Sequence, residues 1–543
     1  MNNYNNAPMG HEDAKDRDDI EQSYIDVTSM IPSGAYTASS LHDAKIVVGR
    51  KGSGKTHVLL HIRQLSQKDG RDVVYTQLDH DLFKGRGLHP YQGGRGPEQS
   101  VSMWASIWRV ALDMAALSRF TARRVSAKAR EAIEASLEAL DIEPGADPLR
   151  SFREAMADRH GELAPELDIP IDPIEALELL LQRYKHLNSL TTFLEDVNFR
   201  YVENEIAVLL HRHGVVHFVI DGLDEYAYAD PKGWLDLQVG LFTAAFELAT
   251  VRTYTQYLRL TMSLRNYVFT RASQTPHIDR ARSHILRLNW DDHSARKFLN
   301  ERLLKLHGGA FARSDKLVGK NPLAGWLGFE TVQSPRRDAQ EDVVRYLLRH
   351  SRLSPRNVVE VFNSLCAVQN TLANDGRVMT EFEFRTVVEG QARSVASLML
   401  KVAAEEIIAL LPSGAFNRRS SHAPEYLITD IAEKISLTIS ECGSEVIDRT
   451  DCNAKLVRSL ARRLDLDDVD HFEDVLKDLE AALWRSSVIA YLQEGEGGAR
   501  WAFSWSASDL APAGNAQTAR KVGFHSCLIA YCSLEVAADG PVF

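Results

Sequence analysis

Short apolar runs rich in β-branched residues alternate, in the first half of the chain, with longer segments in which apolar residues recur every three or four positions. Such runs have the composition of buried strands, and such spacing is typical of amphipathic helices. The predicted strands are 46–48, 73–78, 215–220 and 257–264, and the predicted helices beside them are 57–66 and 235–251. The alternation of strands and helices predicts an α/β domain with a parallel sheet.

Residues 98–212 separate the second predicted strand from the third and have helical spacing almost throughout. Trp104 and Trp108 stand four positions apart in this stretch. A domain built only of the alternating strands and helices would not need so many residues here, so we predict a helical insertion. We interpret the two tryptophans as core residues rather than as a platform for stacking bases.

The second half of the chain is mainly helical in pattern and ends in a mixed region. Helical spacing returns at 294–307, 338–350 and 355–370. Further on, the predicted helices 454–464 and 472–484 precede a predicted hairpin of 488–493 and 500–504, joined by a glycine-rich turn. Helices followed by such a hairpin resemble a winged helix. We therefore predict an α+β carboxy-terminal module that is a winged helix.

The first predicted strand leads into the octapeptide Gly-Arg-Lys-Gly-Ser-Gly-Lys-Thr, a complete G-x-x-x-x-G-K-T phosphate-binding pattern. Its glycines let backbone N–H groups turn toward phosphate oxygens, and the following helix adds its positive end. We expect Lys55 to reach the β- and γ-phosphates of ATP and the Thr56 hydroxyl to hold Mg²⁺. A chance match is the alternative, which the strand before the pattern and the helix after it disfavour. The predicted binding residues are Gly49, Arg50, Lys51, Gly52, Ser53, Gly54, Lys55 and Thr56.

An acidic cluster ends the third predicted strand, where the sequence reads Ile-Asp-Gly-Leu-Asp-Glu. A strand that delivers a carboxylate to the mouth of a parallel sheet suits Mg²⁺, so we predict that Asp221 binds the ion opposite Thr56. Hydrolysis also needs a carboxylate that orients and deprotonates the attacking water, and either Glu225 or Asp224 is predicted to do this. The alternative is a helix N-cap with solvated charges, which the intact phosphate-binding pattern disfavours.

The acidic box resembles the Walker B box of the STAND class of signalling ATPases, in which Asp-Gly-Leu-Asp-Glu follows four apolar residues. The wider arrangement is similar to a related family of bacterial P-loop ATPases whose type member is cyanobacterial. This resemblance covers roughly residues 45–370 and implies a RecA-like P-loop domain with a helical lid. The further motifs that carry it are Ser-Leu-Arg at 263–265, Leu-Asn-Trp at 288–290 with Arg302, and Ser-Pro-Arg-Asn at 354–357.

The resemblance also implies roles for two arginines. Arg265 stands at a strand end, where such ATPases place a sensor of the γ-phosphate, and Arg356 stands where a second sensor closes helices over the nucleotide. A guanidinium pairs bidentately with phosphate and stabilises charge on the transferred group, which agrees with both roles. A surface or helix-capping arginine is the alternative at each position. The chain lacks the Met-His-Asp signature of apoptotic and plant STAND proteins, which argues against their kind of ADP locking.

The composition limits the classes of partner. A net charge of −11 gives no global attraction to nucleic acid or to acidic membranes. No stretch reaches the ~20 apolar residues of a membrane span, and the amino terminus lacks the apolar core of a secretory signal. The five cysteines are odd in number and lack metal-ligand spacing, which suits a reducing compartment. We therefore predict a cytoplasmic protein without a membrane partner.

Two basic stretches could contact nucleic acid, one at 119–130 and one that comprises Arg345, Arg349 and Arg352. However, charged helical faces are usually solvated, and the predicted recognition segment 465–480 is strongly acidic. We therefore favour a regulatory switch ATPase that acts through a protein partner or effector, or as a homo-oligomer. The family resemblance adds a setting in bacterial anti-phage defence. The alternative is a nucleic-acid-dependent motor or loader, and a phosphotransferase is disfavoured because no acceptor pocket is evident.

These predictions divide the chain into four parts. Residues 1–22 are Asn-rich and charged, and their composition predicts disorder. The P-loop domain is predicted at 23–290, with the helical insertion at about 98–212. A helical lid domain follows at 291–394, and the carboxy-terminal module comprises 395–543.

Overall fold

A computed structural model describes residues 45–77, 97–117, 172–177, 215–222, 231–250, 258–273, 284–305, 321–334, 339–411, 424–466, 471–495, 498–504 and 519–537. The chain divides into two compact units. One comprises Met1–Ala38, Gly49–His57 and Arg287–Phe543, and the other comprises Ser39–Val48 and Val58–Leu286. The predicted disordered segment and most of the predicted insertion lie outside the described residues. The boundaries of the four predicted parts stay predictions.

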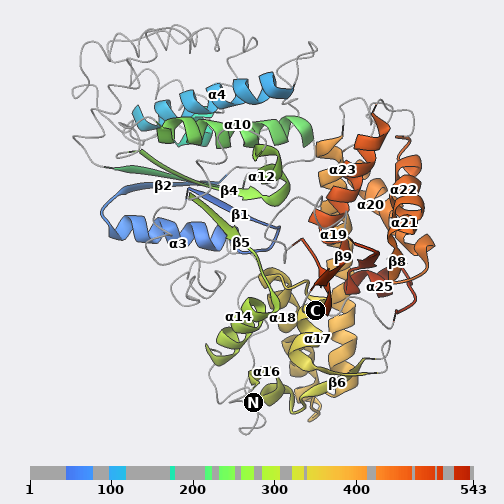
Figure 1. The fold of residues 1–543 in the computed structure, drawn as a ribbon. Coiled ribbons are helices and arrows are strands. Elements are labelled where there is room, and N and C mark those ends of the chain that lie inside the picture. Colours follow the sequence, from blue (N-terminus) through green and yellow to red (C-terminus); the bar gives the residue numbers. More distant parts are fainter. Residues whose placement is uncertain are drawn as a thin grey trace, which may run out of the picture. The chain divides into compact units, whose positions relative to one another are not determined.

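Five parallel strands form one sheet in the order β2-β3-β4-β1-β5 (Figure 1). They are β1 (Ile46–Gly49), β2 (Asp72–Gln77), β3 (Val216–Asp221), β4 (Leu258–Arg265) and β5 (Ile285–Leu288). The prediction of an α/β fold with a parallel sheet is confirmed. β3 is buried along its whole length, as expected for a strand in a sheet that helices cover on both faces. β5 is short, and the sequence pattern did not predict it.

Helices cover this sheet, with α3 (Lys55–Lys68) on one face and the pair α4 (Pro97–Leu117) and α10 (Pro231–Thr250) on the other (Figure 1). The helix α12 (Asn266–Ala272) follows β4 directly. α4 and α10 approach closely at Gly240. A Cβ built at this glycine would lie only 2.4 Å from the Cβ of Trp104. Trp108 donates from Nε1 to the Leu237 carbonyl at 3.0 Å. Both tryptophans are buried, so their interpretation as core residues is confirmed.

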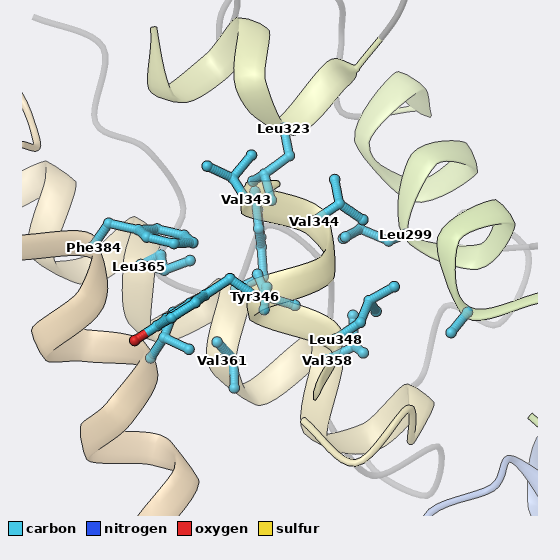
Figure 2. Close-up of a cluster of buried hydrophobic side chains, with 14 of the residues drawn as sticks. Leu299, Leu323, Val343, Val344, Tyr346, Leu348, Val358, Val361, Leu365 and Phe384 are labelled. Atoms are coloured by element: carbon cyan, nitrogen blue, oxygen red, sulfur yellow. The ribbon is translucent and has the colours of Figure 1, made fainter. Parts of the chain in front are cut away.

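A helical region begins after the last parallel strand. Its helices are α14 (Asp292–Lys305), α16 (Pro322–Leu327), α17 (Val343–His350), α18 (Pro355–Asn374) and α19 (Glu381–Leu410). Their apolar faces meet in one hydrophobic cluster, to which Tyr346, Val358 and Phe384 contribute from three different helices (Figure 2). Burial of this cluster removes apolar surface from water and holds the region together.

The predicted helix 338–350 begins later than expected. Residues Ala339–Asp342 form the strand β7, which pairs antiparallel with β6 (Thr331–Ser334). The prediction was wrong here because Ala-Gln-Glu-Asp has no apolar alternation that would mark a strand. Asp342 then starts the helix as an N-cap, since its side chain accepts a hydrogen bond from the backbone N of Arg345 at 2.9 Å.

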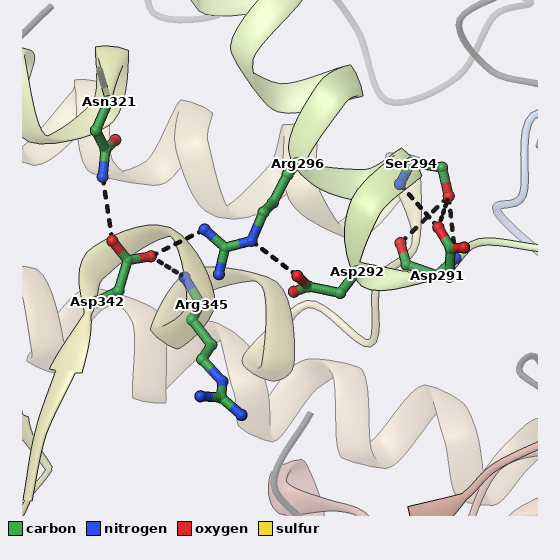
Figure 3. Close-up of polar contacts among 7 residues, drawn as sticks. All are labelled: Asp291, Asp292, Ser294, Arg296, Asn321, Asp342 and Arg345. Atoms are coloured by element: carbon green, nitrogen blue, oxygen red, sulfur yellow. Dashed lines mark hydrogen bonds and ion pairs between the residues drawn. The ribbon is translucent and has the colours of Figure 1, made fainter. Parts of the chain in front are cut away.

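The same carboxylate joins three elements of the region (Figure 3). Asp342 accepts from Arg296 Nη1 at 3.1 Å and from Asn321 Nδ2 at 3.2 Å. Arg296 also donates from Nε to Asp292 at 2.8 Å, one turn earlier on α14. The starts of α14, α16 and α17 are therefore fixed around one polar cluster.

The carboxy-terminal region is a mixed α+β structure. Its elements are α20 (Pro424–Cys442), β8 (Val446–Asp448), α21 (Arg449–Asp451), the π-helical segment η5 (Cys452–Val457), α22 (Arg458–Arg463), α23 (Phe472–Arg485), β9 (Ile489–Gly495), β10 (Gly498–Ala502), β11 (Lys521–Phe524) and α25 (Ser526–Tyr531). The strands form a separate antiparallel sheet in the order β10-β9-β11-β8.

The predicted hairpin is confirmed in this sheet, because β9 and β10 pair antiparallel with Leu492 opposite Trp501. The two predicted helices are also confirmed, the first as η5 and α22 and the second as α23. The strands β8 and β11 were not predicted. Among the helices that the structure describes, none combines the length and the apolar character that crossing a membrane requires.

Candidate functional site

The segment Gly49–Thr56 connects β1 to α3, and its backbone shows why glycines occur in it. Gly52 and Gly54 have φ values of 81° and 93°, in the left-handed region that favours glycine. At Gly49, an added Cβ would lie 2.3 Å from the Oγ of Ser53 and 3.3 Å from the Cβ of Leu288. The loop therefore has a tight curvature that larger residues at these positions would not permit.

Lys55 begins α3, and its side chain folds back over the start of the loop. Its Nζ donates to the carbonyl of Arg50 at 3.1 Å and to that of Gly49 at 3.4 Å. The residue is buried, so its ammonium group is held at the loop rather than in open solvent. A lysine ammonium with three donors at such a loop has the chemistry needed to bind phosphate oxygens.

The loop is bonded to the Ser-Pro-Arg segment that starts α18. The carbonyl of Gly52 accepts hydrogen bonds from Ser354 Oγ at 3.1 Å and from the backbone N of Arg356 at 3.3 Å. A Cβ at Gly52 would lie 2.8 Å from Ser354 Oγ and 3.1 Å from the Cβ of Arg356. Two segments some 300 residues apart in the sequence thus meet backbone to backbone, and Arg356 lies beside the phosphate-binding pattern.

A second motif from the same series also contacts the loop. Trp290 is fully buried and donates from Nε1 to the carbonyl of Ser53 at 2.9 Å. Its ring packs edge-on against Phe298, with 5.4 Å between the ring centroids. Arg302 of the same motif lies over the ring of Phe298, with its guanidinium carbon 5.0 Å from the centroid. The Leu-Asn-Trp and Ser-Pro-Arg segments therefore fix two successive carbonyls of the loop.

The acidic end of β3 belongs to the other compact unit. Asp221 is buried, and its two carboxylate oxygens accept hydrogen bonds from Ser263 Oγ at 2.7 Å and from Tyr75 Oη at 3.1 Å. These two donors come from β4 and β2, the strands on either side of β3. They fix the orientation of a carboxylate that is predicted to bind Mg²⁺, as the outer shell of a metal site does.

Arg265 is the last residue of β4 and is buried. Because β4 lies between β3 and β1, the strand order brings Arg265 to the same edge of the sheet as Asp221, between the ends of those two strands. Parallel strands end at one edge, which is where α/β sheets bind ligands. The position agrees with the predicted sensor role, which itself stays a prediction.

Several predicted residues are not brought together by the described structure. Asp224 and Glu225 lie outside the described residues. Thr56 belongs to one compact unit and Asp221 to the other, so their shared Mg²⁺ ion stays a prediction. Within the described ranges, no three His, Cys, Asp or Glu side chains are grouped so as to hold a metal ion by themselves. The five cysteines are free thiols.

The sequence reasoning missed the turn that precedes the Ser-Pro-Arg segment. Arg352 and Leu353 have φ values of 59° and 51°, although neither residue type favours the left-handed region. The carbonyl of Arg352 accepts a hydrogen bond from Arg50 Nη2 at 3.4 Å. The proline that follows was the local signal for a turn, but it does not indicate which residues adopt positive φ.

His525 is a buried histidine near these arginines. Its Nδ1 accepts a hydrogen bond from the backbone N of Cys527 at 3.2 Å and caps α25. Burial, and then the charges of Arg352, Arg50 and Arg349, hold its pKa well below the ordinary value of about 6.5. The imidazole therefore stays neutral in the folded protein under mildly acidic conditions.

This depressed pKa predicts a loss of stability in acid. Below about pH 6.5 the unfolded chain protonates His525 and the folded chain does not, so stability falls as the pH falls, by up to about 1.4 kcal/mol per pH unit. His525→Asn keeps an N-cap acceptor but does not titrate. Denaturant unfolding at pH 7, 6 and 5 should show a smaller loss in the variant than in the wild type. Carboxylates titrate in both proteins and cancel in the difference, so parallel losses would contradict the prediction.

Comparison with known proteins assigns this chain to no family. No protein-family model matches the chain, and no curated protein matches it.

Proposed function

We propose that this chain is a P-loop ATPase that binds ATP with Mg²⁺ and hydrolyses it to ADP and phosphate, as a regulatory switch related to the STAND class. The observation that carries the proposal is the loop Gly49–Thr56, which has left-handed glycines and a buried lysine at its end. The two motifs that contact its carbonyls are those that the family resemblance selects, which supports the same conclusion. The parallel sheet would then be a RecA-like core, and the carboxy-terminal region would be a winged helix with one additional strand.

Each predicted site residue has its own role in binding or hydrolysing ATP. Lys55 and the backbone N–H groups of the loop bind the phosphates. Thr56 and Asp221 are the residues that would hold Mg²⁺, and the ion would neutralise charge on the phosphates. Glu225 or Asp224 orients a water molecule and accepts its proton as the water oxygen bonds to the γ-phosphorus. The bond from that phosphorus to the bridging oxygen breaks, and ADP leaves with the electron pair.

The two sensor arginines complete this scheme. Arg265 stabilises the charge on the transferred phosphoryl group. Arg356 closes α18 over the nucleotide. The hydrogen bond from its backbone N to the Gly52 carbonyl already joins the start of α18 to the loop. Turnover would then change the contacts between the loop and the helical region, and this change is the output of the switch.

The nucleic-acid alternative loses part of its support. Of the basic set Arg345, Arg349 and Arg352, the last two are buried. Arg349 forms an ion pair with Glu341 at 2.9 Å, and Arg352 bonds within the protein. Such side chains do not present charge to a phosphate backbone. We therefore keep the proposal that the ATPase acts through a protein partner or as a homo-oligomer. The proposed location is the cytoplasm, and the family resemblance adds a setting in anti-phage defence.

The proposal is tested on the purified full chain. ATP binding by calorimetry and phosphate release should both be measurable with Mg²⁺, and phosphate release should not increase on addition of single-stranded DNA, duplex DNA or RNA. Light scattering with and without ATP reports any change of oligomeric state. No binding of ATP or GTP at millimolar concentration would refute the site, and strong stimulation by nucleic acid would favour the motor or loader.

A further inference from the structure

The turn between α17 and α18, residues 351–354, is held on two sides. On one side the phosphate-binding segment contacts it, since Arg50 donates to the Arg352 carbonyl and Ser354 donates to the Gly52 carbonyl. On the other side the guanidinium of Arg352 donates from Nη2 to the carbonyl of Ser486 at 2.5 Å. All of these residues belong to one compact unit. The α17–α18 turn therefore links the loop to the carboxy-terminal module.

The far end of this link is the turn that enters the β9–β10 hairpin. Ser486 and Ser487 connect α23 to β9. Ser487 Oγ lies 2.9 Å from Ser504 Oγ, which in turn donates to the carbonyl of Arg485 at 3.1 Å. Ser504 lies just after β10, so the Ser486–Ser487 turn is bonded to the segment that leaves the hairpin. A displacement of Arg352 would thus act on the segments that enter and leave the hairpin.

Further contacts join the carboxyl end of α17 to α25. Ser526 Oγ donates to the carbonyl of Arg349 at 3.2 Å, and Cys527 Sγ donates to that of His350 at 3.1 Å. Arg349 and His350, just before the turn, are therefore bonded to the module. Ser354, at the end of the turn, is bonded to the loop. Arg352 itself is the one residue of the turn whose backbone bonds to the loop and whose side chain bonds to the module.

The backbone of this link is strained. Two consecutive residues without the freedom of glycine, Arg352 and Leu353, have left-handed φ values, and Ser487 has a φ of 67°. Each such conformation is costly and persists only where the surroundings over-determine it, and such residues cluster at ligand clamps and switch regions. Left-handed residues therefore lie at the donor of the hydrogen bond, Arg352, and directly after its acceptor, Ser486.

The choice of arginine at 352 also needs a reason. The side chain is buried, and burial lowers its pKa to about 10. Within the described part of the chain, its guanidinium bonds to a carbonyl and a hydroxyl and forms no ion pair with a carboxylate. A buried charge with neutral partners does not favour folding over an apolar residue of similar length. A role of the bond to Ser486 in the switch would explain an arginine at this buried position.

We propose that Arg352 couples the phosphate-binding loop to the carboxy-terminal module, so that nucleotide in the loop stabilises the Ser486–Ser487 turn and the hairpin behind it. The coupling rests on the proposed ATP site. ATP fixes the loop, the loop fixes the α17–α18 turn through Gly52 and Arg50, and Arg352 fixes the carbonyl of Ser486. By linkage, a partner that binds the module and orders this turn would increase the affinity of the loop for ATP by the same factor.

Hydrogen–deuterium exchange of the full chain, with and without ATP and Mg²⁺, tests the coupling. In the wild type we expect slower exchange at 49–57 and also at 484–492, the latter by a factor of about five or more, the lower end of typical coupling. Arg352→Met keeps the length of the side chain but removes its donors. In this variant 49–57 should still be protected by ATP, while 484–492 should no longer respond.

A matched control is Arg458→Met, which breaks an exposed ion pair with Glu473 in the same module. It should behave as the wild type. No change at 484–492 in the wild type, or an equal change in Arg352→Met and Arg458→Met, would overturn the coupling. A lack of protection at 49–57 in the wild type would instead overturn the ATP site on which the coupling depends. The wild-type comparison needs no variant, so it can overturn the coupling even if Arg352→Met does not fold.

Discussion

Lys55→Ala should weaken ATP binding by about ten- to a hundredfold and abolish measurable phosphate release. The substitution removes the ammonium group that lies 3.1 Å from the carbonyl of Arg50, at the first turn of α3. A hydrogen bond to a charged group contributes about 1.5–3 kcal/mol, which sets the expected loss of affinity. The loss of turnover should be larger, because the positive charge stabilises the transferred phosphoryl group more than the bound substrate.

The control for this variant is Lys68→Ala, at the exposed end of the same helix. It removes an equal charge far from the loop and should leave ATP binding unchanged. Calorimetric titration of both variants, with thermal melting to verify folding, makes the comparison. Equal affinity in wild type and Lys55→Ala would refute the assignment of the loop.

Trp290→Ala should destabilise the unit that contains it by about 3–5 kcal/mol, the usual loss for a buried aromatic side chain. Trp290 is fully buried, packs on Phe298, and donates to the carbonyl of Ser53. The variant leaves a cavity beside α14 and releases one side of the loop. Urea unfolding followed by circular dichroism measures the change.

Trp290→Phe separates the two contributions of this side chain. It keeps an aromatic ring against Phe298 but removes the Nε1 donor. We expect a smaller loss of stability than in Trp290→Ala, of about 1–2 kcal/mol, for the lost hydrogen bond and the smaller ring. If both variants unfolded at the same urea concentration as the wild type, the packing described for Trp290 would be wrong.

The fold was predictable where local pattern decides it. The apolar runs of β1 to β4 and the glycine-rich turn of the β9–β10 hairpin have signals within a few residues. The strand β7 lacks such signals, because its pairing partner rather than its own side chains makes it a strand. The strand β8 has only three residues, which is too short for a pattern to be recognised.

The candidate site shows the same limit. The octapeptide could be identified by itself, because its glycines and lysine are consecutive. Its contacts with Trp290 and Ser354 could not be deduced from spacing, since more than two hundred residues intervene. The order of weak motifs drew attention to the two segments but did not predict these contacts. The left-handed backbone at Arg352 has no sequence signal, because the surrounding structure imposes it on a residue type that does not favour it.

The hydrogen bonds that Ser354 and Trp290 donate to the carbonyls of Gly52 and Ser53 also limit how such genes can recombine. Recombination between related genes often exchanges whole domains, and a crossover after the last parallel strand would join one parent's octapeptide to another parent's Trp and Ser-Pro-Arg segments. A hybrid of this kind would divide the compact unit that contains both the octapeptide and these segments, and the contacts at the loop would be mismatched. We therefore expect proteins with this architecture to inherit the part before the crossover point and the part after it from the same parent. The two parts should then diverge together.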